Sequence, residues 1–289
     1  MYFIDFFKNL FKKSNIGVII YLIMNVLIIV ALFSRGFEET TGIYVGIIAY
    51  IVSILLALSP IGEWILRLQT GCKPIKRKEY LNRLMPLFDE VYQKVKAKNK
   101  GISDHVKLFM SNDKEPNAFA TGRKTICLTK GLLEYSDEEI KAVLAHEFGH
   151  IAHKDTDLIL IITVGNFIVT FIFVIYRLII QLIGLLVAIA MDSVAVLITN
   201  FFIDVILVFV MWVWTKIGTL LVMHSSRKNE FLADSFAFDL GYGNELASVL
   251  DSFDGVKQKG LWANLKSSHP DTDDRVAKLQ ELGITYTKS

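Results

Sequence analysis

The sequence predicts an α-helical membrane protein with about four transmembrane helices and with soluble segments that combine helices and strands. Hydrophobic residues make up 53% of the 289 residues, above the roughly 45–50% apolar content of ordinary soluble domains. The excess lies in blocks that carry few charges and are long enough to cross a bilayer. The segments between these blocks show helical periodicity and short runs typical of strands.

The charge and the cysteine content narrow the class of protein. The formal net charge of +2 gives no reason to expect a nucleic-acid partner. The two cysteines, Cys72 and Cys127, form no disulfide framework and suit a reducing compartment. The first apolar block shows no signal-peptide cleavage pattern, because large aliphatic residues stand where small ones are required.

Residues 1–60 are expected to form a membrane hairpin. Ile16 to Phe33 carries no charge and would span about 27 Å as a helix. Gly42 to Leu58 makes a second span, with a short loop at 34–41 between the two. Tyr2 to Lys13 has an apolar face typical of an interfacial helix, although an ordinary lead-in to the first span accounts for this pattern equally well.

Basic residues on both sides of this hairpin predict its orientation. Positively charged residues are retained on the cytoplasmic side of a membrane. We therefore expect the N-terminus and the segment after the hairpin to be cytoplasmic. The basic residues are Lys8, Lys12 and Lys13 before the hairpin, and Arg67, Lys73, Lys76, Arg77 and Lys78 after it.

The first soluble segment, residues 61–157, begins with a helix and short strands. The helix is expected from Arg77 to Lys98, where its periodic apolar positions end. Strands are expected at His105 to Met110 and within Asn117 to Thr129, where the chain folds back at residues 121–124. Gly122 in this turn favours such a reversal.

A second helix in this segment carries the motif around which the chain is organised. Ser136 and Glu139 form an S-x-x-E capping box, and the helix that they start contains the H-E-x-x-H motif of His146, Glu147 and His150. Because residues four apart lie on one helical face, both imidazoles can reach one metal ion. Zinc accepts such ligands, and Glu147 is placed to act on a water molecule at the metal.

The motif by itself is compatible with two alternatives to a catalytic metal. The histidines can be an accidental pair on a helix surface, or they can hold a structural metal ion, until a third ligand is identified. Gly149 lowers the helix propensity by about 1 kcal/mol relative to alanine. We take this glycine to predict that another element packs closely against the helix beside the metal.

Residues 158–223 contain four charged side chains and predict a second pair of membrane spans. An even number of spans is required if the soluble segments on either side share one site. We place the spans at 158–178 and 202–223, with an apolar connection at 179–200 that can dip into the bilayer. Two of the charges are then expected near the outer interface: Arg177 and Asp192.

The second soluble segment, residues 224–289, is expected to be helical. Its predicted helices are His224 to Leu240, Asn244 to Val256 and Pro270 to about Leu282, with a loop at Leu261 to His269. Gly241 is a suitable end for the first of these helices. Pro270 suits the first position of the last one, because that position needs no N–H donor.

This segment supplies the candidate third ligand, Glu230. Glu230 and Asp234 lie four residues apart on one helical face, where an acidic pair repels unless a cation faces it. A zinc ion would be that cation, with Glu230 as a ligand and Asp234 accepting a hydrogen bond from a ligand imidazole. A solvated acidic face is the alternative. His153 lies about 10 Å along the axis from His146, too far to share one ion with it.

Four motifs follow the N-terminal hairpin in a defined order. They are N-A-F-A-T-G at 117–122, H-E-F-G-H at 146–150, R-x-x-E-x-x-A-D at 227–234, and S-H-P at 268–270 followed by Arg275. Together they resemble the HtpX-type membrane zinc metalloproteases, which are relatives of the CAAX prenyl endoproteases. The resemblance covers nearly the whole chain, and no expected catalytic position departs from the family pattern.

This resemblance implies a cytoplasmic α+β zincin-like metalloprotease domain on a multi-pass protein of the plasma (inner) membrane. The cofactor would be Zn²⁺, held by the two motif histidines and Glu230, with Glu147 as general base. The resemblance also implies that His269 assists at the oxyanion and that Arg275 orders that loop. By its position alone, His269 is simply the residue before the proline that starts a helix.

The resemblance further implies a role in quality control, so the expected partners are misfolded or damaged membrane proteins, other unfolded polypeptides and the lipid bilayer. An edge strand would align the substrate backbone, although an ordinary hairpin strand has the same pattern. Its residues are Asn117, Ala118, Phe119 and Ala120. A dedicated processing protease for prenylated or signalling substrates and a non-catalytic zinc-dependent scaffold or transporter remain alternatives. The oligomeric state is left open.

Overall fold

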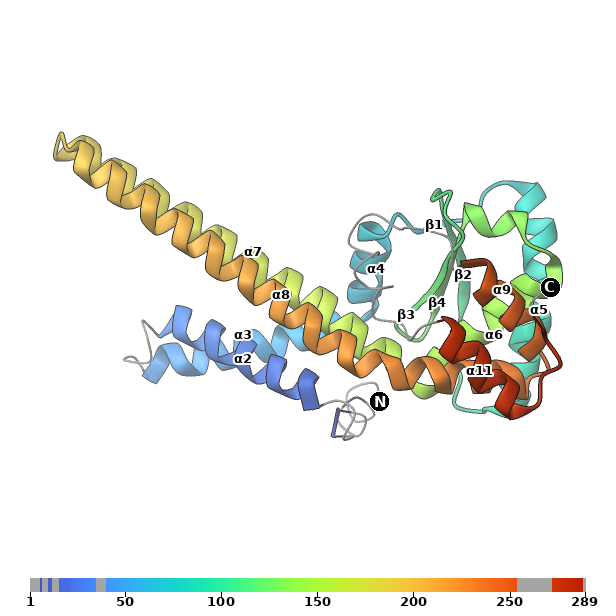
Figure 1. The fold of residues 1–289 in the computed structure, drawn as a ribbon. Coiled ribbons are helices and arrows are strands. Elements are labelled where there is room, and N and C mark those ends of the chain that lie inside the picture. The colour runs from blue at the N-terminus through green and yellow to red at the C-terminus, as the bar shows by residue number, and fades with distance from the viewer. Residues whose placement is uncertain (1–5, 7–9, 12–15, 35–39, 254–271, 288–289) are drawn as a thin grey trace.

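The structure is a computed structural model that describes all residues except 1–5, 7–9, 12–15, 35–39, 254–271 and 288–289. A compact part of helices and a small sheet lies at one end of the molecule, and two helical hairpins extend away from it (Figure 1). The interfacial helix expected at 2–13 falls largely outside the described residues.

The N-terminal hairpin consists of α2 (Ile16–Phe33) and α3 (Thr40–Ala57), within one or two residues of the expected spans. Among the described residues, three helices are long and apolar enough to cross a membrane: Thr40–Ala57, Asp155–Ala190 and Val194–Ile217. The apolar stretch Ile16–Ala31 of α2 is slightly shorter. Each of these four stretches overlaps one of the spans that the sequence predicts, although the last two differ from them in length.

The second hairpin is much longer than expected. Helix α7 (Asp155–Ala190) and helix α8 (Val194–Asp239) are continuous and antiparallel, and they meet in a turn at 191–193. The separate connection predicted at 179–200 is therefore wrong, because no proline interrupts this stretch and its apolar residues continue both helices. The expected break between a span ending at residue 223 and a helix starting at 224 is also absent.

The position of Arg177 differs from the one that the sequence predicts. Arg177 does not lie at the outer end of the hairpin, because it pairs with Asp204 partway along the two helices. The turn carries Asp192 with a positive φ of 46°. Arg177, which was expected at an interface, is thus paired with a carboxylate of the neighbouring helix.

The two hairpins pack together near the compact part. The rings of Tyr21 in α2 and Trp214 in α8 stack with centroids 5.4 Å apart, and the indole N–H of Trp214 donates to Asn25 over 3.2 Å. The short helix α4 (Pro60–Gln69) follows α3 and is capped by the side chain of Ser59. A buried apolar cluster joins residues of α2, α3, α4, α7 and α8.

The sheet has four strands in the order β1-β2-β4-β3. They are β1 (Lys73–Pro74), β2 (Lys107–Ser111), β3 (Ala118–Thr121) and β4 (Thr125–Thr129). Strands β2 and β4 are parallel, whereas β1 and β3 pair antiparallel with their neighbours. Strand β3 is therefore an edge strand.

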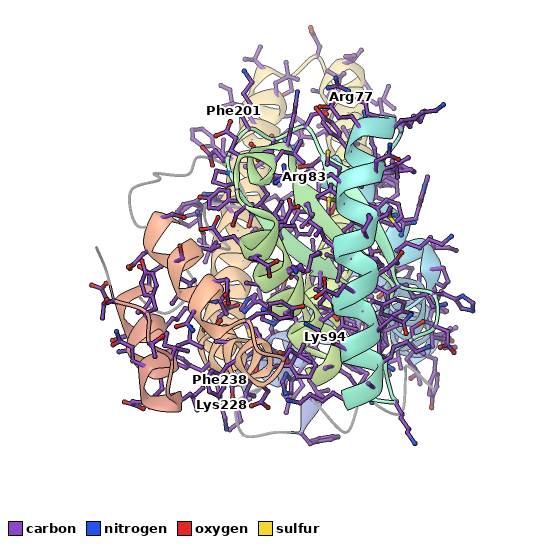
Figure 2. All side chains as sticks on the ribbon, turned by 90° about the vertical axis from the view of Figure 1, so that its right-hand side faces the viewer. Arg77, Arg83, Lys94, Phe201, Lys228 and Phe238 are labelled. Atoms are coloured by element: carbon purple, nitrogen blue, oxygen red, sulfur yellow. A yellow bond between two sulfur atoms is a disulfide. The ribbon has the colours of Figure 1, made fainter. Side chains whose placement is uncertain are left out.

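The remaining helices cover this sheet and enclose one core. They are α5 (Lys78–Lys98), the short 3-10 helix η2 (Lys130–Glu134), α6 (Asp137–His153), α9 (Gly243–Phe253) and α11 (Thr272–Leu282). Helix α5 packs through Phe88 and Tyr92 against Phe148 of α6. Arg77, Arg83 and Lys94 mark its course along the outside of the compact part in Figure 2.

The two cysteines are paired, in contrast to the sequence prediction. Cys72, just before β1, forms a disulfide with Cys127 in β4, with Cα atoms 6.3 Å apart. Strand β2 lies between these segments in the sheet. The pairing was not predictable from the sequence because the two residues are separated by 55 positions.

Candidate metal centre and active site

Helix α6 carries the H-E-x-x-H motif in its buried middle. The hydroxyl of Ser136 accepts from the backbone N–H of Glu139, and the side chain of Glu139 accepts from the backbone N–H of Ser136 over 3.0 Å. This capping box starts the helix where the sequence predicts it. Lys154, with a φ of 63°, ends α6 and allows α7 to leave in a new direction.

Helix α8 crosses α6 at Gly149, as the sequence predicts. A Cβ atom on Gly149 would lie 2.8 Å from the Cα atom of Ala233, so a larger residue would push the two backbones apart. This close approach brings Glu230, one turn earlier on α8, over the two histidines. Glu230 is 2% exposed and is therefore not part of a solvated acidic face.

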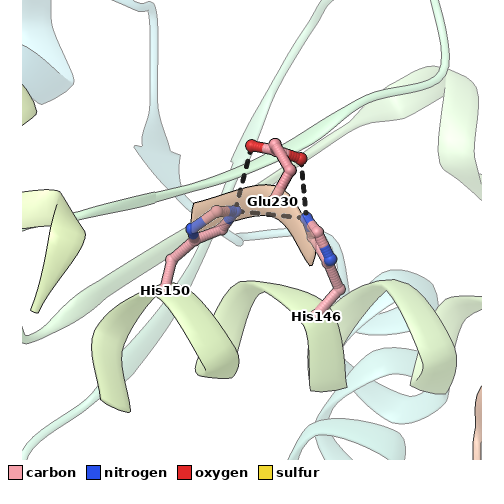
Figure 3. Close-up of side chains that lie close together, drawn as sticks. All are labelled: His146, His150 and Glu230. Carbon is pink, nitrogen blue, oxygen red and sulfur yellow. Dashed lines mark hydrogen bonds and ion pairs between the residues drawn. The ribbon is translucent and has the colours of Figure 1, made fainter. Parts of the chain in front are cut away.

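The three expected ligands converge in the structure (Figure 3). The Nε2 atoms of His146 and His150 lie 3.2 Å apart. Oε2 of Glu230 lies 3.5 Å from Nε2 of His146, and its Oε1 lies 3.4 Å from Nε2 of His150. Bonds of about 2.0–2.2 Å to a tetrahedral zinc ion would place its ligands about 3.3–3.5 Å apart. The spacing of these donor atoms therefore fits zinc.

The outer nitrogen of each histidine faces a carboxylate. Nδ1 of His146 lies 2.8 Å from Oδ1 of Asp234, and Nδ1 of His150 lies 3.5 Å from Oδ2 of Asp155. Such partners orient a ligand ring and fix its tautomer. The sequence predicts Asp234 in this place, whereas Asp155 was missed. Only the break at Lys154, which has no clear sequence signal, brings Asp155 back toward the site.

Arg275 of α11 lies inside the site. Its guanidinium donates two hydrogen bonds to Asp234, of 2.6 and 2.8 Å, and its Nη1 lies 3.3 Å from Glu230. Arg275 is 6% exposed. Its observed contacts hold the carboxylates around the metal ligands, whereas the family resemblance implied an effect on the loop that contains His269.

The electrostatics of the site favour positive charge at the ligand nitrogens. Burial alone would lower the pKa of His146, but Asp234 and Glu230 outweigh burial and raise it. Burial alone would also lower the pKa of His150, but Glu230 outweighs burial and raises this pKa well above its usual value. Burial would raise the pKa of Asp234, but Arg275 outweighs it and lowers that pKa. A cation is the natural occupant of such a centre.

Glu147 links the motif helix to the edge strand. The backbone N–H of Ala120 in β3 donates to Oε2 of Glu147 over 2.7 Å. The N–H of Thr129 in β4 donates to the carbonyl of Asn117, so residues 117, 119 and 121 direct their backbone groups to β4. Ala118 and Ala120 alternate with them and direct their backbone groups away from β4, toward the site.

The turn between β3 and β4 is held by α4, which follows the N-terminal hairpin, and by α7 of the second hairpin. The backbone N–H of Arg123 donates to Glu63 of α4 over 3.1 Å, and its guanidinium pairs with Asp157 of α7. The hydroxyl of Thr156 donates to the carbonyl of Gly122 over 2.5 Å. Burial raises the pKa of Glu63, more than its hydrogen bonds lower it. The position of β3 thus depends on how the membrane helices enter the compact part.

Two further histidines, His153 and His269, were considered in the sequence analysis. His153 is not among the converging ligands, because its Nδ1 lies 2.8 Å from the carbonyl of Gly149 and its ring contacts Phe236. This contact leaves it half-buried rather than exposed. His269 lies outside the described residues. The structure therefore brings together the three ligands, Glu147, Asp234 and Arg275, beside the strand that begins at Ala118.

A candidate metal centre with a carboxylate beside an edge strand, on a chain with long apolar helices, is the arrangement expected of a membrane metalloprotease. Comparison with known sequences gives the particular family. The chain belongs to peptidase family M48, whose family model matches residues 81–283. It is an integral membrane protein, as its helices and its relatives indicate.

Curated relatives carry the name predicted from the motifs. The chain is 25% identical to a Protease HtpX of Psychrobacter sp. (strain PRwf-1), over 82% of this chain and 81% of that one. It is 33% identical to a Protease HtpX of Hahella chejuensis, over 57% and 62% of the two chains. A crystal structure of Ste24p from S. mikatae shares 19% identity at a TM-score of 0.47, covering 88% of this chain and 61% of that one, which is too remote a likeness to bear on function.

Proposed function

We propose that this protein is a zinc endopeptidase that hydrolyses misfolded or damaged membrane proteins. The observation that carries the proposal is the convergence of His146, His150 and Glu230, whose ligand atoms lie within 4.8 Å of one another, with Glu147 beside them. Zinc, when bound there, polarises a water molecule and the scissile carbonyl. Relatives named Protease HtpX support the assignment.

In the proposed reaction the chain positions three components. Glu147 takes the proton of the attacking water as general base and then gives it to the leaving amine nitrogen. Asp234 and Asp155 hold the two ligand imidazoles in one orientation. Arg275 lowers the pKa of Asp234 in a buried site, where a carboxylate without a cation would tend to be protonated, and it also contacts Glu230.

The edge strand would bind the substrate in an extended conformation. The outward backbone groups of Ala118 and the carbonyl of Ala120 can pair with a substrate strand, as in other complexes formed by strand addition. The N–H of Ala120 already donates to Glu147. A substrate paired with β3 would therefore present its peptide bond next to the general base.

The central experiment compares the wild type with Glu147→Gln, purified in detergent with zinc. We expect hydrolysis of an unfolded membrane protein to fall by about 10²–10⁴-fold, with zinc content unchanged because Glu147 is not a ligand. Glu138→Gln is the matched control, since Glu138 is exposed at the start of the same helix. Equal turnover of the wild type and Glu147→Gln would defeat the hydrolytic mechanism and favour a zinc-dependent scaffold or transporter.

The number of substrates and of cleavage sites distinguishes a quality-control protease from a dedicated processing protease. A quality-control protease is expected to cut many unfolded membrane proteins at several positions. A processing protease would cut one site in a prenylated or signalling substrate. Mass spectrometry of the products from a mixture of destabilised membrane proteins separates these outcomes.

The proposed location is the inner membrane, with the metal site in the cytoplasm. The basic residues that flank both hairpins support this orientation, whereas a disulfide is more typical of an oxidising compartment. Labelling intact cells with an impermeant maleimide at an introduced cysteine, Lys76→Cys in a chain with Cys72→Ser and Cys127→Ser, decides between the two sides. Labelling before lysis would overturn the cytoplasmic orientation.

A further inference from the structure

Polar side chains line the contact between α7 and α8 well away from the metal centre. Nη2 of Arg177 donates to Oδ2 of Asp204 over 2.6 Å, and its Nε donates to the other oxygen. One turn further toward the tip, Nδ2 of Asn200 donates to Oε1 of Gln181 over 2.9 Å. Asn200 packs where Gly184 leaves space, since a Cβ there would lie 2.4 Å from its amide carbon.

The Arg177–Asp204 pair lies at the middle of an apolar stretch. On α8, Asp204 is twelve residues from Asp192 and twelve from Lys216, or about 18 Å from each along the axis. The hydrocarbon core of a bilayer is about 30 Å thick. An ion pair in this position is expensive and by default marks a functional path.

The pair is incompletely covered by the protein. The side chain of Arg177 is 34% exposed and that of Asp204 is 21% exposed, and exposed apolar residues such as Leu178 and Val205 lie next to them. The two hydrogen bonds to Asp204 use two of the five N–H donors of the guanidinium. Lipid tails offer no acceptor for the others, so a polar partner within the membrane would be favoured.

A cavity adjoins this pair on the side toward the metal site. It has a volume of about 760 Å³ and lies between α2 and the α7–α8 hairpin, where the two hairpins diverge in Figure 1. Its walls are apolar and include five aromatic residues: Phe33, Phe173, Tyr176, Phe209 and Trp214. Phe173 lies one helical turn before Arg177 on the same face of α7, so the apolar lining leads to the ion pair.

We propose that this surface binds a transmembrane helix of the substrate that carries an unpartnered polar residue. The cavity would accept the apolar side chains of that helix, and the Arg177–Asp204 pair would hydrogen-bond its polar residue. An acyl chain could fill the cavity but has no group for the ion pair. Because assembled membrane proteins cover such residues with their own helices, this surface selects unassembled or damaged proteins. The inference rests on the proposed function.

The continuous helix α8 sets the distance from this surface to the metal. From Lys216 to Glu230 it advances fourteen residues, or about 21 Å. An extended substrate covers that distance in about six or seven residues at about 3.3 Å each. Cleavage is therefore expected about six or seven residues beyond the end of the bound membrane helix.

The test uses two single-span reporters in liposomes containing the zinc-loaded protein. One has a polyleucine membrane helix, the other has one asparagine at its centre, and both carry the same cleavable segment. We expect wild-type kcat/KM to be about three- to tenfold higher for the asparagine reporter, in line with a single hydrogen bond inside a membrane. A ratio near one overturns the inference, whereas failure to cut either reporter or a soluble unfolded polypeptide overturns the proposed function itself.

Variants of Arg177 and Asp204 test whether the ion pair causes the difference in kcat/KM between the two reporters. In R177L/D204L the ratio should fall to about one, while the exchanged pair R177D/D204R should keep it. Leu186→Ala with Val194→Ala, both exposed near the tip, is the matched control and should keep the wild-type ratio. A retained ratio in R177L/D204L overturns the inference.

A second measurement does not depend on the folding of these variants. A photoreactive phenylalanine analogue in place of Phe173 should cross-link the asparagine reporter more than the polyleucine reporter. Equal cross-linking of both reporters, or exclusive cross-linking to a second copy of this chain, overturns the proposed occupant.

Discussion

Helix α8 passes through two regions that differ in how far their charged side chains are buried and paired. In one region Glu230 is buried and faces His146 and His150 of α6 and Arg275 of α11. Around Asp204 a single arginine faces one carboxylate, and both are partly exposed among apolar residues. One region is enclosed by three helices, and the other lies between two.

This difference in burial and pairing fits a catalytic role for the region around Glu230 and a binding role for the region around Asp204. A catalytic centre needs fixed ligands, and complete partnering holds His146, His150 and Glu230 in one arrangement. A surface that binds variable partners needs unused hydrogen-bonding capacity at an accessible place, which the Arg177–Asp204 pair offers. Helix α8 thus connects the candidate metal centre to a surface where the Arg177–Asp204 pair has unused hydrogen-bonding capacity.

The largest effect should come from removing a ligand of the enclosed region. Glu230→Gln replaces a charged ligand by a neutral amide beside Arg275. Because loss of an outer partner already lowers metal affinity or activity by about 10–100-fold, we expect more than about 100-fold loss of hydrolysis, with reduced zinc content. Glu281→Gln, exposed on α11, is the control. Full activity of Glu230→Gln would remove it from the ligand set.

Arg275→Met tests whether complete partnering stabilises the enclosed region. It leaves Asp234 and Glu230 buried without their cation, and breaking such a pair costs about 3–5 kcal/mol. We expect that loss in the free energy of unfolding of the metal-free protein, measured in detergent. Lys278→Met on the exposed side of the same helix should change it by less than about 1 kcal/mol. Comparable values for both variants would contradict the role assigned to Arg275.

Two glycines, one in each region, differ in what packs against them. A methyl group on Gly149 meets the backbone of Ala233, which cannot rotate away, so Gly149→Ala should cost about 1–3 kcal/mol and weaken zinc binding. A methyl group on Gly184 meets the side-chain amide of Asn200, which can turn aside. Gly184→Ala should cost less and leave zinc binding unchanged. Thermal unfolding and zinc titration of both variants measure the difference, and the reverse order would refute the argument.

The smallest effect concerns Glu63, which joins the membrane part to the strand beside the site. Burial raises the pKa of Glu63, so the folded protein binds this proton more tightly than the unfolded chain. Stability is therefore lost as the pH rises from the ordinary glutamate pKa through the raised one. Glutamine cannot lose a proton, so the melting temperature of Glu63→Gln relative to the wild type should increase between pH 4 and pH 8. Glu79→Gln, an exposed change, should show no such trend.

The local parts of this protein were predictable from its sequence alone. The capping box at Ser136 fixed the start of the motif helix, and the spacing of His146 and His150 placed both on one face, because helix geometry relates residues three or four apart. The acidic pair at Glu230 and Asp234 was predictable because its spacing is unfavourable without a cation. The charge-free blocks predicted the N-terminal hairpin.

Contacts between distant residues became visible only in the tertiary structure. Arg275 enters the site from α11, Asp155 returns to His150 after the break at Lys154, and Cys72 meets Cys127 across the sheet. The single hairpin of α7 and α8, with Arg177 opposite Asp204, replaced an expected connection because pairing across the hairpin fixes the register. Local periodicity carries no information about such partners, since packing of whole elements selects them.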